Sequence, residues 1–352
     1  MIFPRQRRGG QPLGEPTELD RGRLFRAVGL VLALVMLCGT GVVGGNGVAL
    51  GYSRPHYHVW NPNLLGVRQE IRYEQVPQGY ETLYLFHPRG KATRPRPVLV
   101  YIHGGALIYG SAVIPPGTTP HDRLMVGVER QAIHNGWDFV SVNYRLAPEH
   151  RWPIPLLDVK HAIRYLQQHA GQLGINAKDM AVMGDSAGGE LSTFVGLTMR
   201  EGTPHLRQHN VVRAVVDLFG PVNREGFAST WRKRFGLKPN PIWGVYSKRN
   251  AARDSAINYV HKGAPPFLIV QGTQDKIVPP NQSRSLAKKL LHLGVPAHLI
   301  MVKHAGHELV PVHHNTDPNI PVIAHAIVKF LTQHLTVVRK HATRSKEALT
   351  TR

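Results

Sequence analysis

The sequence predicts an α/β fold with a mostly parallel central sheet and helices on both of its faces. One observation is an alternation of short, continuously apolar segments with amphipathic helical segments between residues 98 and 335, which is typical of a parallel sheet buried on both faces. Another is the sequence GDSAG at residues 184–188, directly after an apolar segment. This G-x-S-x-G pattern marks a strand that turns sharply into a helix, with Ser186 at the apex.

The predicted elements follow in chain order. Residues 67–73 and 81–87 alternate apolar and polar residues, as half-buried strands do. Ser186 lies where a site is expected, because ligands of parallel sheets bind at the carboxyl ends of the strands. The buried strands are expected at residues 98–102, 139–142, 181–183, 211–219, 266–271 and 298–302. The helices are expected at residues 156–173, 187–200, 283–293 and 320–335.

The chain of 352 residues is long enough for one large catalytic domain, which we expect at residues 54–338. Within it, residues 221–265 interrupt the alternation and carry aromatic residues among basic ones. They are a candidate lid and substrate wall, with an ordinary long excursion as the alternative. The flanking parts are a basic N-terminal segment, an uncharged apolar segment and a basic tail, at residues 1–26, 27–53 and 339–352.

Residues 27–53 are expected to form one N-terminal hydrophobic helix before the catalytic domain. A bilayer span needs about 20 residues. Arginines precede this segment and none lies within it, which predicts a cytoplasmic N-terminus and a catalytic domain outside the cytoplasm. We therefore expect a transmembrane signal anchor, with the membrane as a partner. The alternatives are a signal peptide cleaved near residues 47–49, with export of the domain, and a buried core helix.

The net charge of +21 would suit a membrane surface or nucleic acid. The basic residues are spread along the chain and no nucleic-acid motif is present, so no nucleic-acid partner is expected. The single cysteine, Cys38, excludes an internal disulfide. The histidine pairs at 304/307 and 313/314 have no cysteine or carboxylate pattern beside them, so no metal site is expected. The oligomeric state is left open.

Ser186 needs a general base within hydrogen-bond reach and a third group that orients the base, because a serine hydroxyl is a poor nucleophile near neutral pH. After a G-x-S-x-G turn, these partners follow in the order Asp or Glu and then His. Asp275 comes just after the strand expected at 266–271, although an aspartate there could also cap a turn. His307 follows the strand expected at 298–302, at the same edge of the sheet.

Two histidines follow that last strand, so the strand alone does not choose between them. His304 comes only two residues after it, which leaves little loop to reach Ser186. His307 follows Gly306, a residue type that can adopt a left-handed backbone and aim the next side chain over the sheet edge. We therefore expect His307 to be the base.

The reaction also needs N–H donors for the negatively charged oxygen of a tetrahedral intermediate. One donor is expected from Ala187, the residue after the nucleophile. Further donors are expected from residues 103–106, His-Gly-Gly-Ala, which directly follow the strand expected at 98–102. Glycines in such a loop let the backbone N–H groups turn inward, and a simple tight turn is the alternative.

Several motifs together resemble a known family. They are YIHGGA at 101–106, VNYRLAPEH at 142–150, GDSAGG at 184–189 and the loops that carry Asp275 and His307. From about residue 65 to residue 335 the chain resembles the α/β-hydrolase carboxylesterases of the hormone-sensitive-lipase-like type. Residues 264–275 are also similar to the bacterial feruloyl-esterase-like branch. The resemblance implies the α/β-hydrolase fold and a serine carboxylesterase that needs no cofactor.

The resemblance also implies roles for individual residues. Ser186 would be the nucleophile, His307 the base and Asp275 the group that orients the base. The N–H donors of the oxyanion hole would be Gly104, Gly105 and Ala187. The scaffold residues that hold the oxyanion loop would be His103, Arg145 and Glu149.

The chain departs from the family pattern at two positions. Ala106 stands where a third glycine is usual. Glu190 stands on the first turn of the helix after Ser186, where a neutral polar residue is common. A carboxylate near a helix N-terminus is stabilised by the helix dipole, which accounts for Glu190 without a special role.

The sequence thus predicts hydrolysis of small-molecule carboxylic esters through an acyl-enzyme on Ser186. Amide cleavage by the same residues, as in formamidases or peptidases, is an alternative, because the residues alone do not show the leaving group. A non-catalytic binding module on a hydrolase scaffold is a second alternative, which the intact serine, aspartate and histidine disfavour.

Overall fold

The computed structural model describes residues 66–76, 79–90, 92–113, 119–201, 209–227, 242 and 247–336. The segments expected at residues 1–26, 27–53 and 339–352 lie outside the described residues, as does the middle of the candidate lid. Among the described residues, no helix has the length and apolar character that crossing a bilayer requires.

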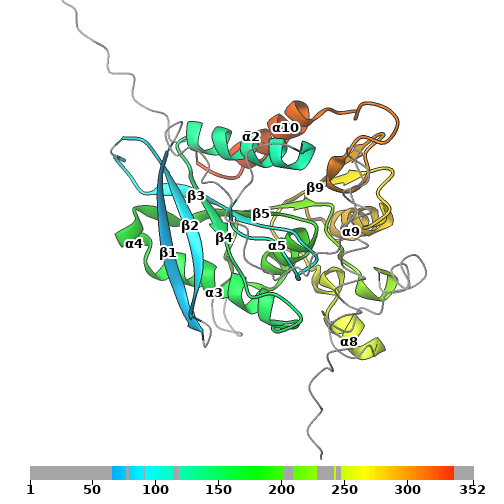
Figure 1. Cartoon of the computed structure of the whole chain (residues 1–352), viewed down its shortest axis with the longest axis horizontal. Coiled ribbons are helices and arrows are strands. Elements are labelled where there is room, and N and C mark those ends of the chain that lie inside the picture. Colours follow the sequence, from blue (N-terminus) through cyan, green and yellow to red (C-terminus); the bar gives the residue numbers. More distant parts are fainter. Residues whose placement is uncertain are drawn as a thin grey trace, which may run out of the picture. The chain divides into compact units, whose positions relative to one another are not determined.

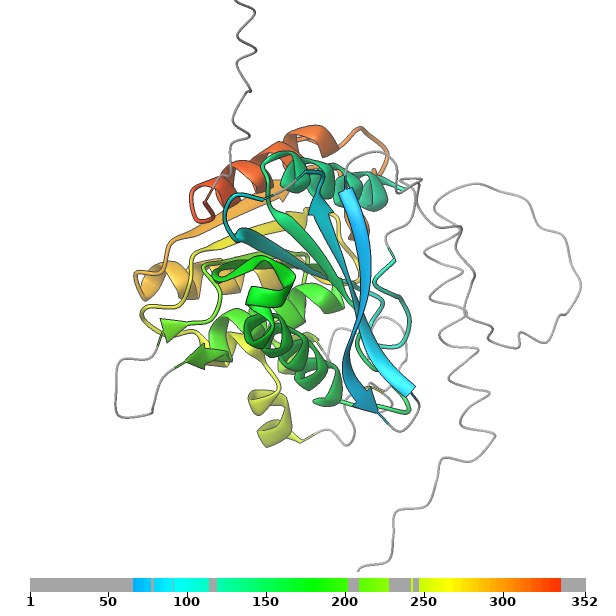
Figure 2. The same cartoon turned by 90° about the vertical axis from the view of Figure 1, so that its left-hand side faces the viewer.

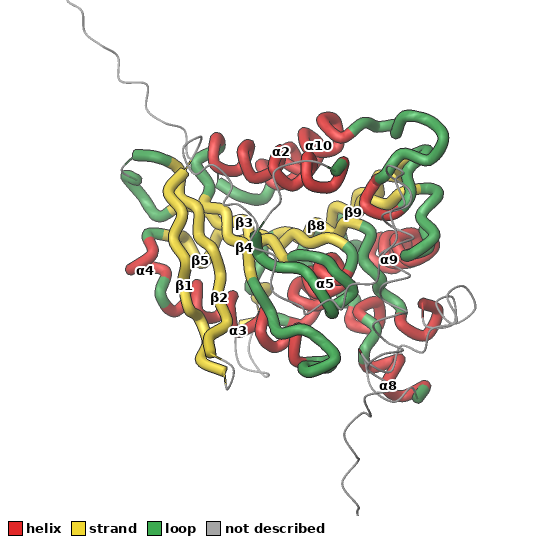
Figure 3. Tube along the Cα trace, viewed as in Figure 1, coloured by secondary structure: helices red, strands yellow, loops and turns green. Residues whose placement is uncertain are grey.

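An eight-stranded sheet forms the centre of the domain (Figures 1 and 3). In spatial order its strands are β1 (Gly66–Val76), β2 (Gly79–Pro88), β4 (Asp138–Val142), β3 (Arg96–Ile102), β5 (Ile175–Asp185), β8 (Ala214–Leu218), β9 (Phe267–Gly272) and β10 (Ala297–Val302). The strands from β4 to β10 in this order pair in parallel, whereas β2 pairs antiparallel with both β1 and β4. The predicted mostly parallel sheet is confirmed.

Helices cover both faces of this sheet (Figure 2). One face carries α2 (Pro120–His134) and α10 (Ile320–Thr332). The other face carries α3 (Ile154–Gln168), α5 (Ala187–Thr198) and α9 (Asn281–His292). The domain therefore has the three-layer arrangement that the alternation of strands and helices predicts.

Strand β3 shows why the buried strands are apolar throughout. Val98, Val100 and Ile102 pack in the core on the side of α3 and α5, whereas Leu99 and Tyr101 pack on the side of α2 and α10. Successive side chains of a strand point to opposite faces, so a strand between two helical layers exposes neither set to water. The continuous apolar segments in the sequence follow from this geometry.

Helix α2 is an element that the apolar pattern does not predict. Its start nevertheless carries local signals, since the Thr119 side chain accepts from the Asp122 N–H and Asp122 accepts from the Thr119 N–H, with Pro120 at the first helical position. Its buried face includes the charged residues Asp122 and Glu129, which interrupt the apolar periodicity. The helix matters for the site because it carries His121.

Smaller differences concern the ends of elements. The helix expected at 156–173 is split at His169, and the strand expected at 181–183 already begins at Ile175. The remaining described elements are short: α4 (Ala170–Leu173), β6 (Arg200–Glu201), β7 (His209–Asn210), α8 (Lys248–Arg253), η1 (Ala256–Tyr259) and η2 (His307–Leu309).

Candidate active site

Ser186 lies at the junction of β5 and α5, as the G-x-S-x-G pattern predicts. Its backbone has φ +50° and ψ −115°, a conformation that non-glycine residues rarely adopt. The Ser186 N–H donates to the Leu218 carbonyl at 2.8 Å, which ties the turn to β8. A Cβ at Gly188 would collide with the carbonyl oxygen of Ile102, and one at Gly184 with that of Gly188. The two glycines therefore allow the turn to pack against β3.

His307 connects Ser186 to Asp275. Its Nε2 lies 3.0 Å from the Ser186 Oγ, and its Nδ1 lies 2.8 Å from the Asp275 Oδ2. With the proton on Nδ1 donated to the carboxylate, Nε2 is free to accept the serine proton. Burial lowers the pKa of His307, but the charge and hydrogen bond of Asp275 outweigh this effect and raise the pKa above its ordinary value.

Asp275 uses its two carboxylate oxygens for different purposes. Oδ1 accepts from the N–H groups of Ile277 and Val278 at 2.8 and 2.9 Å. Oδ2 accepts from the Gln271 side chain at 3.0 Å as well as from His307. The Asp275 carboxylate therefore caps its own turn and contacts the His307 ring at the same time.

The loop that carries His307 differs from the expectation in its backbone. Gly306 is extended, with φ −83° and ψ −158°, so a left-handed Gly306 was the wrong expectation. The residues on either side of it with a left-handed φ include His304 at +57°, Glu308 at +56° and Leu309 at +59°. The His304 ring lies edge-on to the ring of His314, 5.0 Å away, so the turn at His304 directs this side chain to His314 while His307 contacts Ser186.

The candidate oxyanion loop also departs from the expectation. The Gly104 N–H donates to the Asp185 Oδ1 at 3.0 Å, so Gly104 has no N–H available for a substrate oxygen. Among the described residues, no acceptor is bonded to the N–H groups of Gly105, Ala106 or Ala187. The N–H groups without an acceptor in the described part of the chain are therefore those of Gly105, Ala106 and Ala187, and the Gly104 N–H, which was also predicted to be a donor, is not among them.

The backbone of this loop explains how its donors come to be free. Gly105 has φ +106°, and a Cβ there would collide with the Tyr109 carbonyl oxygen. Ala106 and Leu107 follow with φ +54° and +61°, left-handed values that cost alanine and leucine about 1–2 kcal/mol each. The Gly105 carbonyl accepts from Ile108 and Tyr109 at 2.9 and 3.0 Å, which closes the turn and directs its N–H groups away from the strand.

The comparison with known families follows this geometry. The BD-FAE family model matches residues 83–290, which is more than half of the 352-residue chain. The chain belongs to the BD-FAE family. The matched segment includes Ser186 and Asp275, and His307 follows it.

Individual relatives of this BD-FAE protein are named as esterases. It is 32% identical over 231 residues to "Esterase LipC" of Mycobacterium tuberculosis, over 63% of this chain and 55% of LipC. It is 25% identical over 249 residues to "Acetyl esterase" of Salmonella typhi, over 68% of this chain and 71% of that protein. The chain thus spans only about half the length of LipC.

The solved structures support the α/β-hydrolase fold of the BD-FAE chain. A truncated carbohydrate esterase from gut microbiota superposes with a TM-score of 0.59 at 23% identity, over 77% of this chain and 96% of that one. At this level of identity the likeness concerns the fold alone.

Tyr144 is a scaffold residue of the BD-FAE site that the motifs did not single out. Its ring stacks on His103 with centroids 4.3 Å apart, and its hydroxyl donates to the His103 carbonyl at 2.8 Å. The sequence resemblance predicts that His103, Arg145 and Glu149 hold the oxyanion loop. This prediction was right for His103, whose Nδ1 lies 2.7 Å from the Gly104 carbonyl oxygen. It was wrong for Arg145 and Glu149. Arg145 instead pairs with the buried carboxylate of Asp158 on α3, and Glu149 is exposed without a hydrogen bond or ion pair to any described residue.

Glu190 of the BD-FAE chain has a specific partner, so the helix dipole alone does not account for it. Its Oε1 accepts from the Arg224 Nε at 2.9 Å, and both side chains are almost fully buried. The Arg224 guanidinium lies over the Trp152 ring, 4.0 Å from its centroid. Burial raises the pKa of Glu190 although the Arg224 charge opposes this effect. A residue of the candidate lid thus packs one helical turn below Ser186.

Proposed function

We propose that the protein is a serine carboxylesterase that hydrolyses small-molecule carboxylic esters through an acyl-enzyme on Ser186. The observation that carries this proposal is the continuous contact from Ser186 through His307 to Asp275, at 3.0 and 2.8 Å. A serine at a strained turn with both partners in hydrogen-bond reach has the geometry of an activated nucleophile.

In the first step, the Ser186 Oγ attacks the ester carbonyl carbon and its proton passes to the His307 Nε2. The carbonyl oxygen becomes negatively charged and accepts hydrogen bonds from the N–H groups of Gly105, Ala106 and Ala187. Asp275 remains ionised and stabilises the imidazolium through Nδ1. The intermediate collapses when His307 returns its proton to the leaving alcohol, and the acyl group stays on Ser186.

In the second step, a water molecule attacks the acyl-enzyme and gives a proton to the His307 Nε2. The second tetrahedral intermediate uses the same N–H donors. Its collapse releases the carboxylic acid, and the proton returns from His307 to the Ser186 Oγ. Every proton transfer passes through one imidazole nitrogen, so no cofactor is needed for the proposed reaction.

The proposed substrate is an ester and not an amide. The relatives that match this chain over most of its length are named esterase and acetyl esterase, and their names supply the preference between leaving groups. We propose that residues 221–265 contribute the substrate wall. The support is Arg224 of this segment, which is buried against Glu190, one turn after Ser186.

The test is hydrolysis of a panel of p-nitrophenyl esters of graded acyl length, beside the matching anilides. We expect the esters to be cleaved faster than the anilides. The Ser186→Ala variant should lose about 10⁴-fold or more in turnover while its melting temperature stays close to that of the wild type. Activity of the variant within tenfold of the wild type would overturn the proposal.

We also propose that residues 27–53 anchor the chain in a membrane with the catalytic domain outside the cytoplasm. The support is the absence of charged residues from 27 to 53 and the arginines that precede this segment. The full chain should partition with membranes, and a chain that begins at Ser53 should stay in the supernatant and keep its activity. Full-length, uncleaved protein that is soluble without detergent would refute the anchor, and a chain shortened at residues 47–49 would establish the signal peptide instead.

A further inference from the structure

Asp185, the residue directly before Ser186 in the GDSAG sequence, is buried behind the oxyanion loop. Its Oδ1 accepts from the Tyr101 hydroxyl at 2.7 Å and from the Gly104 N–H at 3.0 Å. Its Oδ2 packs so closely against Gly104 that a Cβ at that glycine would collide with it. The position of the Asp185 carboxylate therefore determines the position of Gly104, and through it the start of the oxyanion loop.

His121, near the start of α2, faces the other side of this carboxylate. Its Nε2 lies 3.3 Å from the Asp185 Oδ2, and its Nδ1 lies 3.7 Å from the Asp122 Oδ1. Its ring lies edge-on to Phe219 at 6.3 Å, and the Phe219 ring lies edge-on to His307 at 5.0 Å. His121 is thus packed behind both the oxyanion loop and the candidate base, without contacting Ser186 itself.

The surroundings of His121 keep its imidazole charged. Burial lowers the pKa of His121, but Asp185, Asp122 and the more distant Glu308 outweigh this effect and raise the pKa to about 10. In turn, burial raises the pKa of Asp185, and the positive charge of His121, 3.3 Å away, overcomes that effect and lowers the pKa. The two side chains therefore form a buried ion pair at neutral pH.

The ion pair has a consequence for the loop. Without a partner, the buried Oδ2 of Asp185 would carry an uncompensated charge, which is unfavourable away from water. The carboxylate can relieve this charge by taking up a proton or by rotating, and either change weakens its bonds from Tyr101 and Gly104. A shift of about 1 Å at a group that positions a reacting atom can lower a rate by about 100-fold.

We propose that His121 is a positioning residue for the oxyanion loop. Its imidazolium fixes the position of the Asp185 carboxylate, and this carboxylate fixes the Gly104 amide, which precedes the Gly105 and Ala106 donors. This inference rests on the proposed ester hydrolysis at Ser186. His121 acts through Asp185 and touches neither the substrate nor the reacting atoms.

The test compares two substitutions of the same residue. In His121→Asn the shorter side chain cannot reach Asp185, whereas in His121→Gln the amide nitrogen replaces Nε2 as a neutral donor. We expect His121→Asn to lower kcat/KM for a p-nitrophenyl ester by about 10- to 100-fold. The kcat/KM of His121→Gln should lie between that of the wild type and that of His121→Asn. Affinity for an aryl trifluoromethyl ketone, whose tetrahedral adduct carries an oxyanion, should fall in parallel, and KM should change by less than about threefold.

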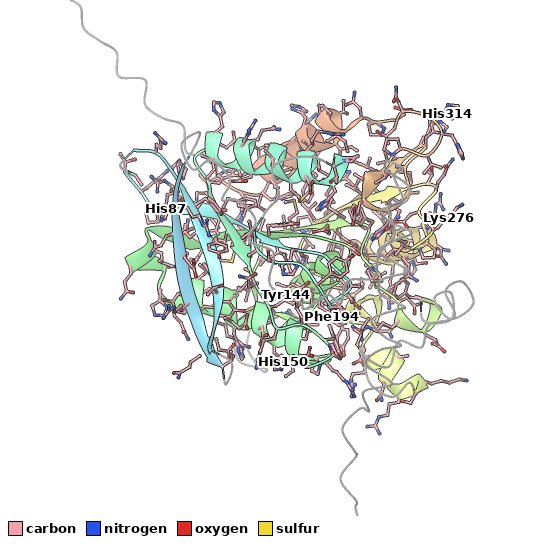
Figure 4. The ribbon with its side chains drawn as sticks, in the orientation of Figure 1. His87, Tyr144, His150, Phe194, Lys276 and His314 are labelled. Carbon is pink, nitrogen blue, oxygen red and sulfur yellow. The ribbon has the colours of Figure 1, made fainter. Side chains whose placement is uncertain are left out.

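A matched control removes a histidine–aspartate pair that joins β2 to β4, at the end of β4 opposite the oxyanion loop. The His87 Nδ1 lies 3.0 Å from the Asp138 Oδ1, and Figure 4 shows His87 at the β1–β2 edge, away from Tyr144 of the oxyanion scaffold. His87→Gln should leave kcat/KM per folded molecule unchanged. Active sites are counted by fluorophosphonate labelling, so that a loss of folded protein is not read as a loss of rate.

The decisive measurement is the combination with Asp185→Asn. If His121 acts only through Asp185, adding His121→Asn to Asp185→Asn should lower kcat/KM by less than about threefold further. Additive losses, or equal rates for His121→Asn and His87→Gln, would overturn the positioning role and leave the proposed esterase function intact. A wild-type chain that neither hydrolyses esters nor reacts with the fluorophosphonate would overturn both proposals.

Discussion

Replacement of Asp275 by asparagine should remove most of the turnover and leave the chain folded. The asparagine Oδ1 can keep the bonds from the N–H groups of Ile277 and Val278. Its NH₂ group, however, takes the place of Oδ2 and faces two donors, the Gln271 amide and the His307 Nδ1–H. The imidazole removes this conflict by moving its proton to Nε2, so that Nδ1 accepts from the asparagine.

The magnitudes follow from the bonds that change. With the proton on Nε2, His307 cannot accept the Ser186 proton, and turnover should fall by about 10³- to 10⁴-fold. Stability loses one charge-assisted bond, worth about 1.5–3 kcal/mol. Gln271 still donates to the Val278 carbonyl at 3.2 Å, so the turn should hold. For a domain of this size the melting temperature then falls by roughly 2–4 °C per kcal/mol.

The assay measures kcat with a short p-nitrophenyl ester and the melting temperature of the same preparation. The control is Asp138→Asn, which breaks the similar Asp138–His87 pair away from Ser186 and should cost stability without lowering turnover per folded molecule. If Asp275→Asn kept its turnover within tenfold of the wild type, or lost no more of it than Asp138→Asn, Asp275 would only cap its turn and the orienting role would be refuted.

Three further predictions concern pH. His307→Ala should be inactive at every pH, whereas His304→Ala should keep a rate plateau above neutral pH, because of these two histidines only His307 contacts Ser186. The pH–rate profiles of both variants test this prediction. The opposite ranking of the two variants would show that His304 is the base. In the wild type, the raised pKa of His307 should place the acid limb of kcat/KM above pH 6.5, since the base works only when neutral. Burial raises the pKa of Asp217, below α5, from 3.8 to about 7. Its proton therefore stabilises the fold at low pH, and this stabilisation is lost as the pH rises from about 4 through 7, in total about 4 kcal/mol. The asparagine side chain of the Asp217→Asn variant does not titrate. The unfolding free energy of this variant, measured by urea titration, should therefore exceed that of the wild type by more at pH 8 than at pH 5. An equal difference at both pH values would contradict the burial argument.

The strands and the order of the triad could be predicted because they depend on local patterns. A strand buried on both faces is apolar at every position, so the segments at 98–102 and 181–183 are recognisable without knowledge of their neighbours. Ser186, Asp275 and His307 each follow such a strand, and the carboxyl ends of parallel strands gather at one edge. Helix α2 was missed because buried charges break its apolar period, although the capping signal at Thr119 was present in the sequence.

Only the tertiary structure decided which hydrogen-bond donors and acceptors are paired within the protein and which remain available to a ligand. The sequence shows Gly104 as a donor for substrate, but Asp185, 81 residues later in the chain, accepts its N–H. In the same way, Glu190 meets Arg224 across 34 residues. Most buried polar groups find a hydrogen-bond partner, and several candidates compete for each one. The outcome depends on distances between separate elements, which the spacing of residues along the chain does not contain.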